Sequence, residues 1–185
     1  MSHITNTSLY LTHTLLNFAL CIVLLRFWMQ WVRAGFRNPV GQFVISVTNP
    51  AVIPLRKILP SISSLDTATV CLALVIAIGK IAILILLSGG AVAIVSSFLY
   101  AVGDVIKFSI YLFFGAIFIQ IITSWVNPYS GHPIISLASS LAEPLMAPAR
   151  KLIPPIGGLD LSPILVFIFL RVSLMLIVAP LQSSF

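Results

Sequence analysis

The feature that most constrains the fold is an internal repeat. When the chain is shifted by 94 residues, positions 31–66 align with positions 125–160 without a gap, and twelve of the 36 pairs are identical. Several matched positions are prolines, and proline makes up only about 5 % of an average protein. A chance match of this kind is improbable, so the sequence predicts a chain built from two copies of one unit.

The apolar character of the chain decides what those units are. Only 8 % of the residues are charged, against about 25 % in an average soluble domain, which is too few to cover a water-soluble surface. A membrane-spanning helix needs about 20 mostly apolar residues. Four such runs, at about 9–31, 65–87, 104–126 and 161–181, predict an all-α membrane protein with four transmembrane helices.

The third apolar run is harder to divide than the others. Residues 91–126 are too many for one ordinary span, and Asp104 and Lys107 interrupt them. We therefore expect a short outer helix at 91–102 before the span. The predicted organisation is a first repeat at 1–88, a connecting helix within 89–103 and a second repeat at 104–185.

The topology follows from the number of crossings. Each repeat crosses the membrane twice, so the repeats are parallel and both loops, about 32–64 and 127–160, face the same compartment. These loops carry Arg33, Arg37, Arg56, Lys57, Arg150 and Lys151. Because Lys and Arg accumulate on the cytoplasmic side, we expect cytoplasmic loops and termini on the periplasmic side.

Each loop begins with a predicted amphipathic helix. Asn38 and Pro39 have the character of an N-cap and a first helical residue, and Pro50 predicts that the helix ends near Thr48. A narrow polar stripe, formed by Gln42, Ser46 and Asn49 in the first copy, favours a helix lying in the membrane surface. A re-entrant helix covered by protein or water is the alternative.

A Pro-rich basic segment follows each of these helices. One interpretation is a rigid elbow whose cations contact anionic lipid headgroups. The other is a docking site in which the two Arg-Lys pairs come together to hold an anionic partner. The predicted lipid or partner contacts are Arg56, Lys57, Arg150 and Lys151, and the predicted structural residues are Pro39, Pro50, Pro54, Pro60, Asp66, Pro133, Pro144, Pro148, Pro154 and Asp160.

The two aspartates of that set open the spans that follow the loops. Aspartate at a helix start accepts hydrogen bonds from unpaired backbone N–H groups, and this is the main role that we expect of Asp66 and Asp160. An ion pair with the nearby Arg-Lys pair is a secondary expectation.

Polar residues within the spans form the last candidate set: Arg26, Lys80, Gln120 and Arg171. Charged groups inside a membrane are costly and raise a functional hypothesis. Arg26 is close enough to the loop end of its span to extend its side chain to the interface. For Lys80 and Arg171 we find no carboxylate deep in a span, which leaves backbone carbonyls, lipid phosphates or another subunit as partners.

The sequence contains no pattern typical of an enzyme. His3, His13 and His132 are scattered, and no nucleophile motif, phosphate-binding loop or metal-ligand spacing is present. We therefore predict no catalytic, cofactor or metal site. The loop charges are too few for a nucleic-acid interface.

The two loops resemble the YggT family of bacterial membrane proteins, which has relatives in chloroplasts. The residues that carry the resemblance are RFWMQWVRAGFRNPVGQFVISVTNPAVIPLRKILPSISSLD and SWVNPYSGHPIISLASSLAEPLMAPARKLIPPIGGLD. The resemblance implies a multi-pass protein of the bacterial inner membrane. It implies no defined activity, only loose associations with osmotic and potassium homeostasis, cell division or shape, and cofactor assembly on a membrane protein in chloroplasts.

Two functional hypotheses remain open at this point. The first is a membrane scaffold or assembly factor that recruits a partner, or organises lipid, through its paired loops. The second is a small oligomeric channel or transporter component, based on the parallel repeat and on Lys80 and Arg171. The expected partners are anionic headgroups of the bilayer, and either another membrane protein or further copies of this chain.

Overall fold

The fold is a bundle of long helices with two bent helices across one end. The computed structural model describes residues 3–61, 65–88, 93–126, 131–153 and 160–183, and in these ranges its regular elements are helical. The helices are α1 (His3–Trp31), α2 (Pro39–Ile58), α3 (Thr67–Ser88), α4 (Ile94–Val126), α5 (Pro133–Leu152), α6 (Ser162–Ser173), a π-helical segment η1 (Leu174–Val178) and α7 (Ala179–Ser183).

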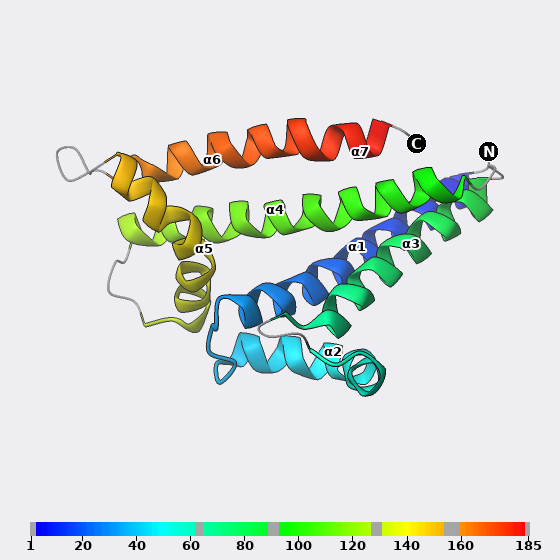
Figure 1. The fold of residues 1–185 in the computed structure, drawn as a ribbon, viewed down its shortest axis with the longest axis horizontal. Coiled ribbons are helices and arrows are strands. Elements are labelled where there is room, and N and C mark those ends of the chain that lie inside the picture. Colours follow the sequence, from blue (N-terminus) through cyan, green and yellow to red (C-terminus); the bar gives the residue numbers. More distant parts are fainter. Residues whose placement is uncertain (1–2, 62–64, 89–92, 127–130, 154–159, 184–185) are drawn as a thin grey trace.

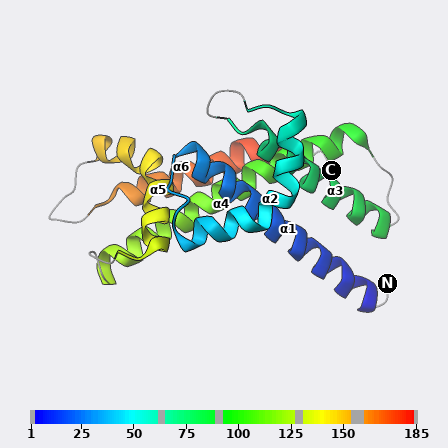
Figure 2. The ribbon, with the colours of Figure 1, turned by 90° about the horizontal axis from the view of Figure 1, so that it is seen from below.

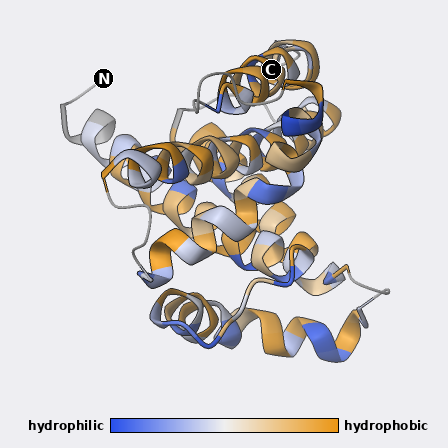
Figure 3. Ribbon diagram, turned by 90° about the vertical axis from the view of Figure 1, so that its left-hand side faces the viewer, coloured by the Kyte–Doolittle hydropathy of each residue, from blue (hydrophilic) through white to orange (hydrophobic). Residues whose placement is uncertain are grey.

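Four helical stretches are long and apolar enough to cross a membrane: Thr7–Trp31, Thr67–Leu87, Ile94–Val126 and Ser162–Ser183. Figure 3 shows hydrophobic residues around the outside of the bundle as well as inside it, and large side chains such as Phe18, Leu86 and Phe118 are exposed. A helix that is apolar on all sides is suited to lipid. The predicted class, an all-helical multi-pass membrane protein with four spans, is confirmed.

The predicted break before the third span is wrong. A single helix, α4, runs from Ile94 to Val126, where we expected a short helix at 91–102 and a separate span from 104. The interruption that we inferred from Asp104 and Lys107 does not arise, because the two side chains form an ion pair one helical turn apart and remain inside the bundle.

The predicted end of each loop helix is also wrong. We expected the first to end near Thr48, but α2 continues through Pro50 and Pro54 to Ile58, and α5 likewise contains Pro144 and Pro148. A proline inside a helix removes one backbone hydrogen bond and bends the helix without having to end it. Figure 1 shows that both helices change direction along their length.

The two loop helices preserve the internal repeat. Each boundary of α5 lies 94 residues after the corresponding boundary of α2. Asn38 caps α2 by accepting a hydrogen bond from the Gly41 N–H, and His132 occupies the equivalent position before α5. Pro154, one of the predicted structural residues, lies outside the described residues.

The arrangement in space places the termini and the loop helices at opposite ends. Figure 1 shows both chain ends on the right, while α2 and α5 cross the other ends of the long helices; we call that region the loop end. α2 packs on α1 and α3, and α5 packs on α4 and α6. Helix α1 of the first repeat also packs on α4 of the second, where the Trp28 and Phe113 rings meet edge to face with centroids 4.7 Å apart.

Candidate functional site

An ion pair ties the end of α2 to the start of α3. The guanidinium of Arg56 donates to the carboxylate of Asp66 at 2.5 Å, and Thr69 Oγ1 donates to the same carboxylate at 2.5 Å. Asp66 is buried, although Arg56 is partly exposed. Burial raises the pKa of Asp66, but the hydrogen bonds from Arg56 and Thr69 lower it by more, so the pKa of this carboxyl lies below its usual value.

The second repeat has the same pair in a more exposed form. Arg150 donates to Asp160 at 3.1 Å and also to Glu143, and the Ser162 N–H donates to Asp160 at 2.9 Å. Burial lowers the pKa of Arg150, but its bonds to Asp160 and Glu143 raise it by more. Asp160 thus accepts a hydrogen bond from a backbone N–H at the start of α6, whereas Asp66 accepts one from the Thr69 hydroxyl. Both aspartates also form an ion pair with the arginine of their own repeat.

The arginine and the lysine of each pair have different surroundings. Arg56 and Arg150 are held by carboxylates of their own repeat. Lys57 and Lys151 are exposed, with no hydrogen bond or ion pair to a described residue. The ends of α2 and α5 that carry these residues lie well apart in both Figure 1 and Figure 2, so the fold does not bring the two Arg-Lys pairs together into one site.

Arg26 is bound inside the protein, and the prediction that it extends to the membrane interface is wrong. Its side chain is only 5 % exposed. Its guanidinium donates to Thr48 Oγ1 at 2.6 Å and to Asn49 Oδ1 at 2.9 Å. Both acceptors are on α2, so Arg26 fastens the first loop helix to α1. The polar stripe that we assigned to the membrane surface therefore contributes Asn49 to an internal contact.

Gln120, which occupies the position of Arg26 in the second repeat, has no such contact. Thr48 and Asn49 correspond to Ala142 and Glu143 there. The Gln120 amide oxygen is buried without a hydrogen-bond partner among the described residues. The side chain lines a cavity of about 670 Å³ between the end of α4, α5 and the start of α6, together with Arg150 and Asp160. The two repeats therefore differ at the loop end, where the second contains a cavity and an unpaired amide.

Lys80 has a carboxylate partner within the membrane-spanning region, which contradicts the expectation that none was available. Lys80 on α3 forms an ion pair with Asp104 on α4, and the two side chains are 2 % and 0 % exposed. Lys80 also donates to Asn17 Oδ1 on α1 at 3.0 Å. The signal in the sequence was the presence of isolated opposite charges, Lys80 and Asp104, in two different apolar runs. We interpreted Asp104, together with Lys107, as a helix boundary and therefore not as a partner of Lys80.

Two further side chains complete this buried network. Lys107 Nζ lies 2.6 Å from Asp104 Oδ1, and the Gln182 amide of α7 donates to the same oxygen at 2.9 Å. The network, defined here as Asn17, Lys80, Asp104, Lys107 and Gln182, connects α1, α3, α4 and α7. Satisfying buried charges in this way removes most of their cost in an apolar medium, so the network stabilises the packing of one repeat on the other.

Arg171 differs from these charged residues. It lies on α6 within the span Ser162–Ser183 and is exposed. No hydrogen bond or ion pair joins it to a described residue, although every other charged side chain within the candidate spans has a partner.

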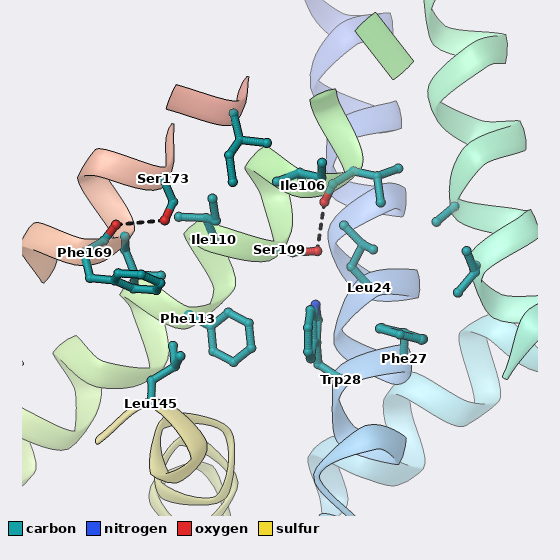
Figure 4. Close-up of a pocket in the computed structure, with 15 residues that line it drawn as sticks. Leu24, Phe27, Trp28, Ile106, Ser109, Ile110, Phe113, Leu145, Phe169 and Ser173 are labelled. Atoms are coloured by element: carbon teal, nitrogen blue, oxygen red, sulfur yellow. Dashed lines mark hydrogen bonds between the residues drawn. The ribbon is translucent and has the colours of Figure 1, made fainter. Parts of the chain in front are cut away.

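An apolar cavity separates parts of the two repeats. Its volume is about 430 Å³, and its walls come from α1, α3, α4, α5, α6 and η1. Figure 4 shows Trp28 and Phe113 facing one another at this cavity, with Ser109 and Ser173 donating to carbonyl groups of their own helices. The Trp28 indole N–H is buried without a partner among the described residues.

Within the described residues, no group of three or more His, Cys, Asp or Glu side chains could hold a metal ion. The side chains that the structure brings together are ion pairs and helix contacts, and they give no positive sign of catalysis. The arrangement can hold helices together and present exposed groups at the loop end and on α6.

Fold and contacts together define the class: a four-span helical membrane protein made of two tandem repeats, each with a bent, Pro-containing helix across one end. The chain belongs to the CCB3/YggT family, whose model matches residues 5–87 and 99–181. Each boundary of the second match lies 94 residues after that of the first, which confirms the register of the internal repeat.

Curated relatives cover nearly the whole chain. An uncharacterized protein of Vibrio alginolyticus is 40 % identical over 90 % of this chain and 90 % of its own length. An uncharacterized protein of Pseudomonas aeruginosa is 38 % identical over 99 % of this chain and 94 % of its own. The uncharacterized protein YggT of Escherichia coli K12 is 32 % identical over 97 % and 93 %. No solved structure matches this chain.

Proposed function

We propose that this chain is a scaffold or assembly factor of the bacterial inner membrane, and that its working surface is the loop end formed by α2 and α5. The role is non-catalytic. Its partners are proteins of the membrane or its cytoplasmic face, together with anionic lipid headgroups.

The charge distribution supports a cytoplasmic loop end. Six of the ten Lys and Arg residues lie in the two loops: Arg33, Arg37, Arg56, Lys57, Arg150 and Lys151. Near the opposite end, Lys107 is paired with Asp104. By the positive-inside rule the loops face the cytoplasm, and both termini face the periplasm.

The proposal rests on one observation: in each Arg-Lys pair the arginine forms an ion pair within the protein, whereas the lysine is exposed. Arg56 and Arg150 anchor the ends of α2 and α5 to the next span through Asp66 and Asp160. The adjacent lysines stay exposed beside large exposed apolar side chains, Ile58 after Lys57 and Leu152 after Lys151. A cation held at a fixed place beside an apolar side chain suits both a headgroup layer and an acidic protein surface.

The experiment is site-specific photocrosslinking in cells. A photoreactive amino acid replaces Ile58 or Leu152, which are 77 % and 75 % exposed, and Leu11 near the other end serves as the control position. We expect discrete protein adducts from the two loop positions. These adducts should disappear in the Lys57→Gln/Lys151→Gln variant, because it removes the exposed cations that we propose to contact the partner. Unchanged thermal unfolding of this variant serves as the control for folding. They should persist in Arg33→Gln/Arg37→Gln, which removes the same charge from the same end. Adducts only with lipid, or adducts unaffected by the lysine changes, would contradict the proposal.

The competing function is an oligomeric channel or transporter component, of the kind that a role in osmotic or potassium homeostasis would require. The buried network favours it because charged groups lie within the spans, and Lys107 is partly exposed. The pairing of Lys80 and Asp104 with each other supports the scaffold instead. Liposomes containing the purified chain should show no ion flux above controls. A flux abolished by Lys80→Met/Asp104→Leu would favour the channel.

A further inference from the structure

Arg171 lies in the membrane-spanning part of the chain with its side chain exposed. Residue 171 is nine positions after Ser162 and twelve before Ser183, where the candidate span ends. At 1.5 Å per residue, this places its Cα about 14 Å from the loop-end boundary of the span. A guanidinium at this depth is costly unless a partner satisfies it.

The other cations of the spans show how this protein satisfies such groups. Arg26 donates to Thr48 and Asn49, whereas Lys80 and Lys107 share Asp104. Arg171 has no hydrogen bond or ion pair to any described residue. It is therefore the intramembrane cation whose partner must come from outside the described chain.

The chain has no carboxylate side chain left for this purpose. It contains four acidic residues, and all four lie in the described ranges. Asp66 is paired with Arg56, Asp104 with Lys80 and Lys107, and both Glu143 and Asp160 with Arg150. A second copy would meet the same shortage and would bring a second Arg171, so self-association would supply no free carboxylate to this residue.

The exposed apolar side chains around Arg171 form a surface on which a second transmembrane helix could pack. Ile168, Val172 and Met175 are exposed, and with Arg171 they follow the spacing of three and four residues that places side chains on one helical face. Met175 itself lies in the π-helical segment Leu174–Val178, which follows α6 directly, and such segments are frequent at functional sites. We call these four residues the α6 face.

We propose that the α6 face binds a transmembrane helix of a different membrane protein, one that carries an aspartate or glutamate at the depth of Arg171. The attraction is a charge-assisted hydrogen bond in a medium of low dielectric constant, and the apolar residues on either side provide packing. This inference rests on the proposed scaffold function, because it names the chemistry of one partner.

The test uses the full chain in phosphatidylcholine vesicles and a synthetic probe. The probe is an acceptor-labelled Leu-Ala transmembrane peptide with one central Asp, and the matched peptides carry Asn or Leu at that position. Energy transfer from a donor attached to the chain measures association at pH 8. We expect the Asp peptide to bind at least about tenfold more tightly than the Leu peptide, which corresponds to 1.4 kcal/mol.

Variants of the chain assign this preference to Arg171. Arg171→Leu should abolish it, Arg171→Lys should retain part of it, and Arg171→Asp should switch the preference to a peptide with a central Lys. Arg37→Leu is the matched control: it removes an exposed cation outside the spans and should leave the preference unchanged. Since Arg171 is exposed and Leu suits lipid, Arg171→Leu should fold, and thermal unfolding of each variant serves as the control for folding.

Several results would overturn the proposal. Equal binding of the Asp and Leu peptides would do so, as would a preference that survives Arg171→Leu. Energy transfer between two labelled copies that requires Arg171 would assign the face to self-association. Loss of the preference when phosphatidylglycerol is added would assign Arg171 to lipid phosphate. None of these results depends on Lys57 or Lys151, so failure here is distinguishable from failure at the loop end.

Discussion

Lys80 on α3 and Asp104 on α4 form an ion pair that is almost completely removed from the protein surface. The pair joins a helix of the first repeat to a helix of the second. Lys107, Asn17 and Gln182 satisfy the remaining bonding groups, so the charges are enclosed by four helices rather than by water.

Removing the Asp104 carboxylate alone should strongly destabilise the folded protein. Asp104→Asn leaves the buried Lys80 and the partly exposed Lys107 without a counter-charge, and we expect a loss of about 3–5 kcal/mol in unfolding free energy. Denaturant unfolding in detergent micelles, followed by circular dichroism, measures this change. The triple variant Lys80→Met/Asp104→Leu/Lys107→Met removes all three charges of the network, and its unfolding free energy should be much closer to that of the parent protein. Equal losses in the two variants would show that the ion pair is not the cause.

The loop-end ion pairs should differ in strength between the repeats. Asp66 is 1 % exposed and Asp160 is 39 % exposed. At pH 7 we expect Asp66→Asn to cost about 2 kcal/mol, as for a hydrogen bond to a charged group. Asp160→Asn should cost less than about 1 kcal/mol because solvent screens that pair. Thermal unfolding of the two variants side by side gives the order, and the reverse order would refute this interpretation.

The same carboxyl predicts a dependence on acid pH. The pKa of Asp66 is lower in the folded protein than its ordinary value, so the ionised carboxylate favours folding. Its contribution is complete above the usual aspartate pKa of about 3.9 and is lost as the pH falls through the lower folded-state pKa. Between pH 5 and pH 2 the parent should therefore lose more stability than Asp66→Asn. Parallel Tm curves for the two proteins would contradict the prediction.

Gln120 and Arg26 provide a matched pair for testing the asymmetry of the repeats. Gln120→Leu removes an amide whose oxygen is buried without a partner, and we expect a gain of about 1 kcal/mol. Arg26→Leu removes the donor of Thr48 and Asn49 and should cost about 2 kcal/mol or more. Urea unfolding measures both, and a loss in Gln120→Leu would mean that its amide has a partner in the membrane.

Two glycines of α4 test how closely α7 approaches it. A Cβ at residue 103 would lie 3.1 Å from Gln182 Cγ and 3.3 Å from Leu181 Cβ, whereas one at residue 115 meets nothing within 4 Å. Alanine is better in a helix than glycine by about 1 kcal/mol, so Gly115→Ala should stabilise. In Gly103→Ala, crowding of about 1–3 kcal/mol should cancel or exceed that gain. Equal Tm values would show that α7 does not pack at this distance.

Much of the architecture could be predicted without coordinates. The four apolar runs predicted a membrane protein, because helices that are apolar on every side are stable when lipid surrounds them. The shift of 94 residues required two like units, and the family match has the same register. These features depend on composition and on spacing along the chain, which are local properties.

The predictions that failed depended on which helix faces meet in space. Whether Lys80 is unpaired depends on whether α3 and α4 bring it to Asp104, a contact between residues 24 positions apart. Whether Arg26 extends to the interface depends on whether α2 folds back onto α1. Pro50 was read as a helix end because it removes one backbone hydrogen bond, but packing against α1 and α3 compensates for that loss.

The sequence by itself thus determined the membrane environment, the number of spans and the duplication, because burial of apolar surface and backbone hydrogen bonding leave no other solution for such a chain. Only the tertiary structure decided how its charges are used. An intramembrane charge is stable only beside its partner, and that partner is chosen by packing between helices distant in sequence. Arg171 is the charged residue of the spans for which no described residue provides a hydrogen bond or an ion pair.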